Sequence, residues 1–456
     1  MFLIYPFLAI ATKVLIFDAG SSGTRVYLYQ YNNSQDPSSY EAVKDEEGNQ
    51  RYKKSRLQLA DAATNNSVID DLYSQLLTDN ANKWIPENER PKVPLMIYAT
   101  GGMRLLSVED QNRVLNLAYE KAKNFKYKIK RDQFKVIKGY EEGIYAWISV
   151  NKLRNAFGTE EKPIPILDVG GASIQFSTQV TGKVDKGLSK FVKNIRIGKQ
   201  YYNVFSYSWL GYGAIESGNI VNWKAYNDSQ KTPCAIKDIN YPVETYDGQK
   251  INVPGDTNFS KCYDYYSDLI LKKGTKENCG GNEPIFMYND ICVPLPEKFD
   301  KIVGLSTVRY GAEFLNLTKF NIKTFKEKIY EFGNKTKEEA EQIKPGYKYL
   351  GVIYSQHILL LNFFTRGFST FINNVTVDAS PKINNVEVEW TLGAVLDAGS
   401  AASIGLEWYY ILLIVLAIII IIIVIVIIIA CCVCKKGKSN KSDNGDDDDS
   451  GSGVNA

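Results

Sequence analysis

The stretch VLIFDAGSSGTRVYLYQY, residues 14–31, predicts the fold of this chain. The apolar run VLIF (14–17) predicts a strand over residues 13–18, an alternating run predicts a second strand over 24–31, and a tight hairpin joins them. The same order of residue types recurs in ILDVGGASIQFSTQV, residues 166–180. Two copies of one strand–turn–strand unit predict two related halves.

Both turns suit the binding of phosphate. Glycines let backbone N–H groups approach a phosphate closely, and hydroxyl groups add donors. Asp18 and Asp168, which precede the turns, would repel phosphate unless they hold a divalent cation, often through water. Two such turns facing each other would hold a polyphosphate chain from both sides. The alternative is that both are ordinary hairpins.

Composition limits the chemistry that the chain can perform. A length of 456 residues suggests two or three domains, and a net charge of +3 is too small to indicate a nucleic-acid partner. His357 is the single histidine, which excludes a zinc site built on several histidines. Acid–base catalysis is therefore expected to use carboxylates.

The C-terminal region predicts a membrane anchor. Residues 409–430 are apolar enough to span a bilayer as a helix, and Trp408 suits the interface. Lysines follow the span, so residues 431–456 are expected to form a cytoplasmic tail of a type I membrane protein. The preceding chain would be extracellular or lumenal. Residues 1–12 are interpreted as a signal peptide, although they could instead extend the first strand.

Other features agree with export. Seven N-x-S/T triplets precede the span and predict a glycoprotein. Four cysteines in the same region allow three pairings and predict two disulfides: Cys234, Cys262, Cys279 and Cys292.

Further elements follow from local patterns. Residues 94–102 predict a strand that runs into a glycine turn, and Ser107 with Asp110 predicts the start of a helix that reaches about residue 124. A second helix is expected over 140–153. Apolar patterns predict helices over 303–314 and 354–368, whereas residues 225–300 suggest an irregular region stapled by cysteines.

Five motifs in this order resemble the conserved regions of ecto-apyrases, the nucleoside triphosphate diphosphohydrolases. They are DAGSSGTR (18–25), ATGGMRLL (99–106), YEEGIYAWISVN (140–151), ILDVGGASIQFS (166–177) and YSWLGYG (207–213). The resemblance runs from about residue 13 to residue 395.

The resemblance implies an α/β fold of two ribonuclease-H-like lobes, as in the actin-like ATPase superfamily, with the active site in the cleft between them. Lobe I would comprise residues 13–138 and 380–405, and lobe II residues 139–379. The implied reaction removes terminal phosphates from nucleoside tri- or diphosphates with Ca²⁺ or Mg²⁺, by direct attack of water. The implied disulfides are Cys234–Cys262 and Cys279–Cys292.

The same resemblance implies roles for individual residues. Glu142 would be the general base, helped by Ser173 and Gln175 in placing the water. Asp18 and Asp168 would hold the metal through water, with Trp390 nearby, and Tyr310 and Arg366 would sandwich the base. The phosphate-binding residues would be Ser21, Ser22, Gly23, Thr24, Thr100, Gly101, Gly170, Gly171, Ala172 and Ser173.

Some positions depart from the pattern of cell-surface members. Gly23 stands where many of them carry histidine, and Gly211 replaces a common cysteine. The preference between tri- and diphosphates therefore stays open, as does the oligomeric state. Two alternative functions remain: an exopolyphosphatase-like phosphatase of the same superfamily, and a catalytically inactive membrane receptor that binds nucleotides.

Overall fold

The computed structural model describes residues 13–31, 39–184, 186–245, 248–269, 284–288, 291–367 and 374–439. The described chain up to Ala402 belongs to one compact unit, and the chain from Ser403 belongs to a second. The predicted signal peptide, residues 440–456 of the predicted tail, and Cys279 lie outside the described residues.

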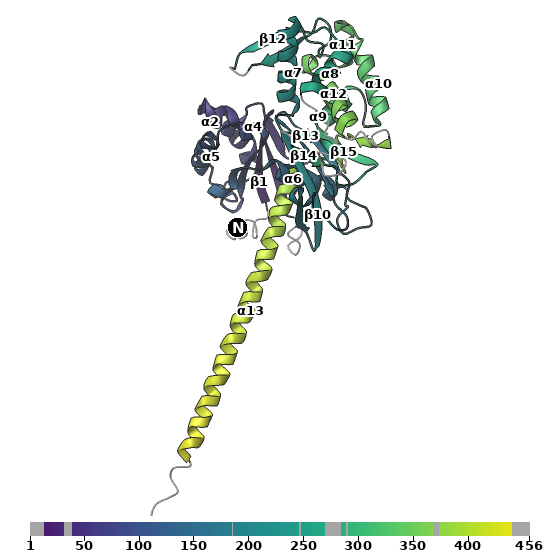
Figure 1. Ribbon diagram of the computed structural model, residues 1–456. Coiled ribbons are helices and arrows are strands. Elements are labelled where there is room, and N and C mark those ends of the chain that lie inside the picture. Colours follow the sequence, from purple (N-terminus) through teal and green to yellow (C-terminus); the bar gives the residue numbers. More distant parts are fainter. Residues whose placement is uncertain are drawn as a thin grey trace, which may run out of the picture. The chain divides into compact units, whose positions relative to one another are not determined.

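The first sheet is built around the predicted hairpin (Figure 1). Strands β1 and β2 pair antiparallel, and β1 pairs in parallel with β5, which places Asp18 between Arg25 and Tyr98. The sheet order is β3 (Tyr40–Ala42), β2 (Gly23–Tyr31), β1 (Lys13–Gly20), β5 (Leu95–Ala99) and β6 (Phe134–Val136), with β4 (Tyr52–Ser55) paired to β2.

The second sheet repeats this arrangement. Its hairpin of β7 and β8 is antiparallel, and β7 pairs in parallel with β15, as β1 does with β5. The order is β16 (Lys319–Phe320), β17 (Thr376–Asp378), β15 (Lys301–Ser306), β7 (Ile166–Val169), β8 (Ser173–Gln179), β10 (Gln200–Leu210) and β9 (Val192–Ile197). The prediction of two related halves agrees with this topology.

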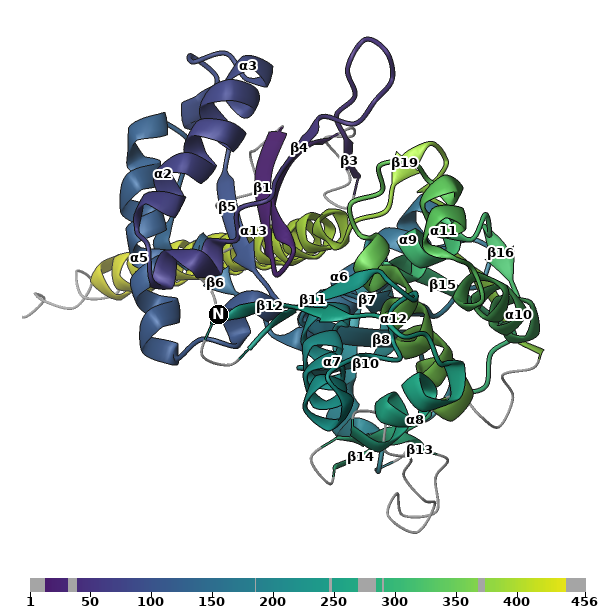
Figure 2. The ribbon, with the colours of Figure 1, turned by 90° about the horizontal axis from the view of Figure 1, so that it is seen from above.

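Helices α2 (Ser67–Tyr73) and α5 (Val108–Ala122) cover one face of the first sheet, where they share a core with β1 and β5 (Figure 2). The predicted start of α5 is confirmed, because the Ser107 hydroxyl accepts a hydrogen bond from the Asp110 amide at 3.1 Å. Such a cap satisfies one of the free N–H groups at the helix start.

Helix α6 (Gly139–Leu153) and the first turns of α13 (Trp390–Ser439) share one core with both sheets. The two helices approach closely at Gly393, where an added Cβ would lie 1.9 Å from the Tyr145 carbonyl oxygen. The Gly393 amide also donates to the Ser149 hydroxyl at 2.8 Å. Only glycine allows this approach between the middle of α6 and the first turn of α13.

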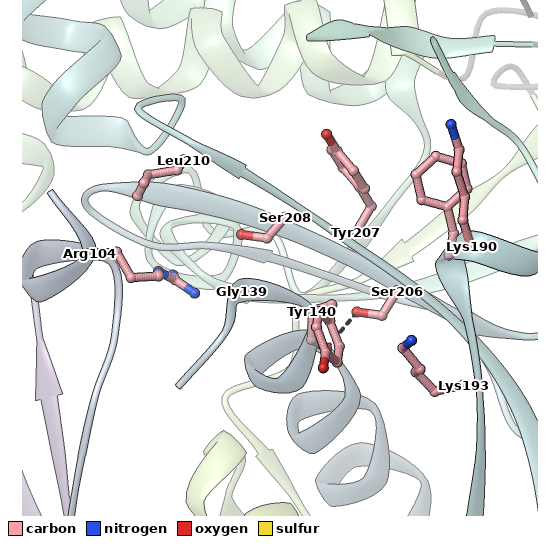
Figure 3. A pocket seen from close by; sticks show the side chains of 10 residues that line it. Arg104, Gly139, Tyr140, Lys190, Lys193, Ser206, Tyr207, Ser208 and Leu210 are labelled. Carbon is pink, nitrogen blue, oxygen red and sulfur yellow. Dashed lines mark hydrogen bonds between the residues drawn. The ribbon is translucent and has the colours of Figure 1, made fainter. Parts of the chain in front are cut away.

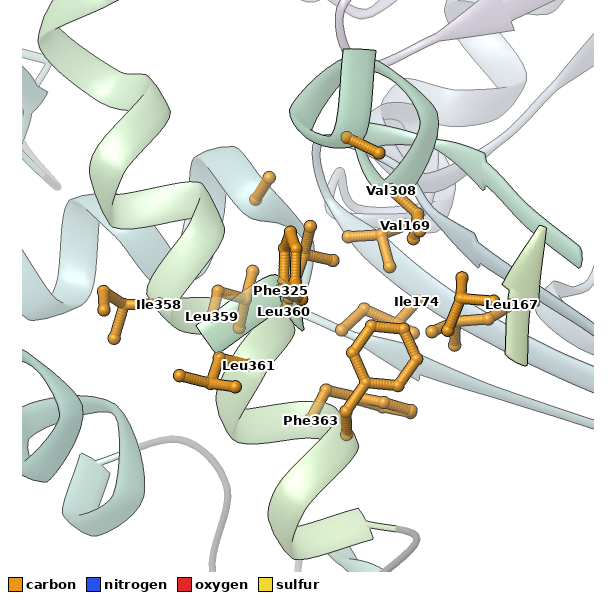
Figure 4. Close-up of a cluster of buried hydrophobic side chains, with 14 of the residues drawn as sticks. Leu167, Val169, Ile174, Val308, Phe325, Ile358, Leu359, Leu360, Leu361 and Phe363 are labelled. Carbon is orange, nitrogen blue, oxygen red and sulfur yellow. The ribbon is translucent and has the colours of Figure 1, made fainter. Parts of the chain in front are cut away.

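The other face of the second sheet carries a large apolar core (Figure 4). Leu167, Val169 and Ile174 of the sheet pack with Leu359 and Leu360 of α12 (Leu350–Asn362). The remaining helices around this core are α7 (Ala214–Ser229), α8 (Phe259–Leu269), α9 (Thr307–Phe314), α10 (Ile322–Gly333) and α11 (Lys337–Ile343).

The predicted helix over 303–314 is wrong in its first part. Residues up to Ser306 belong to β15, a strand buried between β7 and β17, and the helix α9 begins only at Thr307. A short apolar run has no period that separates a buried strand from a helix. The prediction over 354–368 is closer, since α12 continues into a π-helical turn at Phe363–Gly367.

The predicted irregular region over 225–300 is also more ordered than expected. It contains α8 and the hairpins of β11 (Asn240–Glu244) with β12 (Lys250–Pro254) and of β13 (Pro284–Tyr288) with β14 (Ile291–Pro294). The implied disulfide Cys234–Cys262 is confirmed and is fully buried. The second implied disulfide involves Cys279, outside the described residues.

The second unit consists of the rest of α13. Within it, residues Leu412–Ile429 are long and apolar enough to cross a membrane. Their side chains are exposed, as those of a lipid-facing helix would be.

Candidate active site

The two glycine-rich turns meet in space. The Ser21 hydroxyl of the first turn accepts a hydrogen bond from the Ala172 amide of the second turn at 3.0 Å. This contact joins residues that lie 151 positions apart in the chain. The structure therefore places the two turns face to face, as the repeated motif predicts.

Glycine is required where these turns are tightest. Gly23 has a φ of +122°, and an added Cβ would lie 2.4 Å from the Ser55 carbonyl oxygen. A Cβ at Gly171 would lie 2.7 Å from the Ser21 hydroxyl. Neither position has room for a larger residue: the Ser55 carbonyl crowds Gly23, and the side chains of Ser21 and Ile215 crowd Gly171.

A third turn joins the other two. Strand β5 ends at Ala99, and the Thr100 amide then donates to the Ala19 carbonyl of the first turn at 3.1 Å. Gly101 packs against the second turn, where its Cβ position lies 3.0 Å from Ala172. The three predicted phosphate-binding turns therefore lie together. The Thr24 hydroxyl, however, donates a hydrogen bond to the Leu57 carbonyl at 2.9 Å.

Asp18 and Asp168 are buried, and each has one carboxylate oxygen, Oδ1, without a hydrogen-bond partner among the described residues. Burial raises the pKa of Asp18, although Arg25 at 3.1 Å and a hydrogen bond from Trp390 oppose the rise. Burial also raises the pKa of Asp168 to about 6, and the charge of Asp18 adds to this effect. A cation beside these two carboxylates would lower both pKa values by favouring the ionised forms.

The described residues contain no group of three or more His, Cys, Asp or Glu side chains that could hold a metal. A cation here would therefore take the free Oδ1 atoms of Asp18 and Asp168 and complete its coordination with water and phosphate oxygens. The donor set is all oxygen, which suits Mg²⁺ or Ca²⁺.

Glu142 lies in the first turn of α6 and is buried. Its Oε2 atom accepts hydrogen bonds from Arg104 Nη2 at 2.6 Å and from Gln175 Nε2 at 3.3 Å. Burial raises the pKa of Glu142 to about 7; the Arg104 charge opposes this rise, and Asp168 and Asp18 add to it. A carboxylate with such a pKa can take a proton from water near neutral pH.

Ser173 and Gln175 form one network with Glu142. The Gln175 amide donates to the Ser173 hydroxyl at 2.7 Å, and Arg104 Nη2 donates to the same hydroxyl at 3.0 Å. Gln175 also stands directly opposite Asp168 in the β7–β8 pair. The structure thus brings together the three predicted catalytic residues and one of the two aspartates.

The predicted residues outside this centre have different surroundings. Trp390 is buried, bonds to Asp18 and stacks on Tyr145 with ring centroids 6.4 Å apart. Tyr310 is exposed on α9, and Arg309 lies over its ring at 4.5 Å. Arg366 is partly exposed in the turn after α12.

Several residues of the site have no role that the sequence motifs predict. Arg104 lies in the motif ATGGMRLL, and Arg25 is the last residue of the first motif. Ser208 lies opposite Gln175 on β10, and its hydroxyl accepts a hydrogen bond from the Gln175 side-chain amide at 3.0 Å. All three residues lie inside the motifs: Arg25 in DAGSSGTR, Arg104 in ATGGMRLL and Ser208 in YSWLGYG. Their place in a motif is the one sequence feature that could have pointed to the site.

Comparison with known proteins agrees with this arrangement. The chain is 29% identical over 286 residues to the Golgi apyrase of Schizosaccharomyces pombe, covering 57% of this chain and 48% of that protein. It is 25% identical over 397 residues to ectonucleoside triphosphate diphosphohydrolase 5 of Gallus gallus, covering 83% and 86%. This chain thus aligns with about half of the yeast protein and most of the chicken protein.

A solved nucleoside triphosphate hydrolase of Neospora caninum has the same fold, with a TM-score of 0.58 at 13% identity over 87% of this chain and 95% of that one. The predicted mixed α/β fold of two sheets is therefore confirmed. The profile of the GDA1/CD39 (nucleoside phosphatase) family matches residues 12–407. With the two facing turns and their aspartates inside the matched region, this chain is a member of the GDA1/CD39 nucleoside phosphatase family.

Proposed function

We propose that this protein is an apyrase, which hydrolyses the terminal phosphates of nucleoside tri- or diphosphates with the help of a divalent cation. The observation that carries the proposal is the contact between Ser21 and Ala172 beside two buried aspartates with free oxygens. The names of the relatives, an apyrase and a nucleoside triphosphate diphosphohydrolase, support the same reaction.

In this proposal the two glycine-rich turns bind the phosphate oxygens through their N–H and hydroxyl groups. Ser21, Ser22, Gly23 and Thr24 belong to the first turn, and Gly170–Ser173 to the second; Thr24 contributes its backbone, since its hydroxyl is engaged elsewhere. Thr100 and Gly101 close the site at the terminal phosphate. Bound Mg²⁺ or Ca²⁺ would supply positive charge against the phosphate oxygens.

Glu142 acts as the general base. Both of its described hydrogen bonds fall on Oε2, which leaves Oε1 to accept a proton from the attacking water. Ser173 and Gln175 hold this water in line with the terminal phosphorus atom. Arg104 keeps the carboxylate in place and limits the rise of its pKa. Tyr310 and Arg366 are proposed to hold the base, since an aromatic face and a guanidinium plane stack on any base.

The cellular setting is part of the proposal. Helix residues Leu412–Ile429 would anchor the protein, and the lysines after them would stay in the cytoplasm. The catalytic unit would then face the secretory lumen or the cell exterior. The Golgi name of the Schizosaccharomyces pombe relative supports a place in the secretory pathway.

A substrate panel tests the proposed function. We expect phosphate release from nucleoside tri- or diphosphates in the presence of Mg²⁺ or Ca²⁺, and none from inorganic polyphosphate. Release from polyphosphate alone would identify the exopolyphosphatase-like alternative. Nucleotide binding without any release would identify the inactive receptor.

The pH dependence of the reaction follows from Glu142. A general base works in its ionised form, so the rate should fall as the pH drops through its pKa. That pKa is raised by burial from 4.5 to about 7, and a cation at the aspartates would oppose the rise. We therefore expect the acidic limb of kcat/KM between these two values. A profile that stays flat below the ordinary value of 4.5 would contradict the assignment.

A further inference from the structure

A cavity lies beside Arg104, the residue that donates a hydrogen bond to the general base. It has a volume of about 370 Å³ and is formed by α4 (Gly101–Arg104), the start of α6, and the sheet edge of β9 and β10 (Figure 3). We call it the basic pocket. None of the residues of the two glycine-rich turns lines it. Its lining residues are Arg104, Gly139, Tyr140, Lys190, Phe191, Lys193, Ser206, Tyr207, Ser208 and Leu210.

The charge of the basic pocket is positive. Three of its lining residues are cationic, and none carries a carboxylate. Lys190 and Lys193 have no ion pair within the described part of the chain; instead they lie over Phe191 and Tyr140, at 4.8 and 5.3 Å. A contact with an aromatic ring leaves the charge of a lysine uncompensated. The pocket therefore attracts an anion.

Arg104 connects the basic pocket to the active site. Its Nη2 atom donates to Glu142 and Ser173, whereas its Nε and Nη1 atoms are buried without a hydrogen-bond partner among the described residues. The Nη1 atom lies 2.9 Å from the position of an added Cβ at Gly139, a residue of the pocket wall. One end of the guanidinium thus serves the general base, and the other end lacks an acceptor.

The sheet brings the same two places together. Asp168, Gln175 and Ser208 face one another across β7, β8 and β10. Gln175 donates to both Ser173 and Ser208, so it stands between the base network and the pocket. Gln175 on β8 therefore lies between Asp168 on β7 and Ser208, a lining residue of the basic pocket on β10. In Figure 3, Ser206 and Ser208 lie between Arg104 and the two lysines.

We propose that the basic pocket binds a phosphate dianion. Arg104 Nη1 and the Ser208 hydroxyl are the donors at its inner end, and Lys190 and Lys193 supply charge at its rim. Charge-assisted hydrogen bonds from guanidinium and ammonium groups are the usual means of holding phosphate. The volume of about 370 Å³ is large enough for more than one phosphate group.

Two sources have this chemistry: free orthophosphate and a nucleoside monophosphate. Both are products of the proposed reaction, so the idea that the enzyme itself supplies them rests on the proposed function. The binding of phosphate to the basic pocket does not depend on that function. Occupancy would place negative charge next to the guanidinium that holds Glu142. The pocket would then serve as the place where a released product lodges behind the base.

The test is direct binding of radiolabelled orthophosphate to the full-length protein in detergent, by equilibrium dialysis in excess EDTA. Chelation suppresses any binding that needs a cation in the active site and makes the result independent of catalysis. We expect saturable binding by the wild type and at least about tenfold weaker binding by Lys190→Ala/Lys193→Ala, because a charged hydrogen bond contributes about a factor of ten or more.

The matched control is Lys323→Ala/Lys326→Ala, which removes two exposed positive charges from α10. It should bind phosphate as the wild type does, and the melting temperatures of both variants show that they are folded. Absence of saturable binding by the wild type, or equal binding by the two double variants, would overturn the proposal.

A competition experiment identifies the source of the dianion. Unlabelled nucleoside monophosphate should displace labelled orthophosphate from the wild type, whereas the uncharged nucleoside should not. The anion that displaces at the lower concentration is the preferred occupant. Displacement by the nucleoside would overturn the assignment to phosphate, because it would show that the pocket selects the apolar part of the ligand.

Discussion

Replacing Glu142 by glutamine should lower kcat by about 10²- to 10⁴-fold, the usual contribution of a general base. Glutamine keeps the size of the side chain and can still accept the hydrogen bond from Arg104 through its oxygen. It cannot take a proton from water. Nucleotide binding should persist, because the two glycine-rich turns and the aspartates are unchanged, so the loss should appear in kcat. Steady-state phosphate release, with nucleotide binding measured separately, checks the expectation.

Glu141→Gln is the matched control for this experiment. The Glu141 carboxylate accepts the backbone N–H of Lys138 at 2.7 Å and thereby caps the start of α6. The amide oxygen of glutamine can accept the same hydrogen bond, so this variant should keep most of its activity. A Glu142→Gln enzyme that retains more than about a tenth of the wild-type kcat lies outside the range for a general base and would refute the role.

Removal of divalent cations should abolish most of the activity, by about a hundredfold or more, since a metal supplies several kcal/mol of charge stabilisation in such reactions. Without a cation, Asp18 and Asp168 present two buried negative charges to the phosphate chain. Burial raises the pKa of both carboxyl groups, and their free Oδ1 atoms are available to a cation. Phosphate release in excess EDTA, followed by titration with Mg²⁺ or Ca²⁺, measures the effect.

Asp168→Asn sharpens this test. The amide preserves shape but loses the charge, so the variant should need a higher cation concentration for half-maximal activity. The comparison variant is Asp378→Asn. Asp378 is a carboxylate outside the proposed cation site, and it pairs with Lys301 at 3.6 Å. Undiminished activity of the wild type in EDTA would refute the proposed arrangement of cation and turns.

The predictions for individual site residues came from five short motifs that resemble those of ecto-apyrases. Gly23 can be recognised in DAGSSGTR because a tight turn between two patterned strands leaves little choice of residue. The helix expected over residues 140–153 placed Glu142 near a helix start. The repetition of the hairpin indicated that two such turns exist, and the fold then had to bring them together.

Other parts could not be predicted because they depend on distant neighbours. The run at Val303–Ser306 is a strand only because β7 and β17 flank it and satisfy its backbone. Arg104 can be recognised as part of a motif. Its contact with both Glu142 and the basic pocket depends on Gly139 and β10, which follow much later in the chain.

By itself, therefore, the sequence determined the two hairpins, the start of α5 and the apolar span. These features follow from periodicity, turn residues and composition, which act over a few positions. Only the tertiary structure decided that the Ser21 hydroxyl meets the Ala172 amide, and that burial raises the pKa of Glu142 to about 7. The desolvation of Glu142 and the contact between the two turns depend on which surfaces pack together, and no local stretch of sequence specifies that packing.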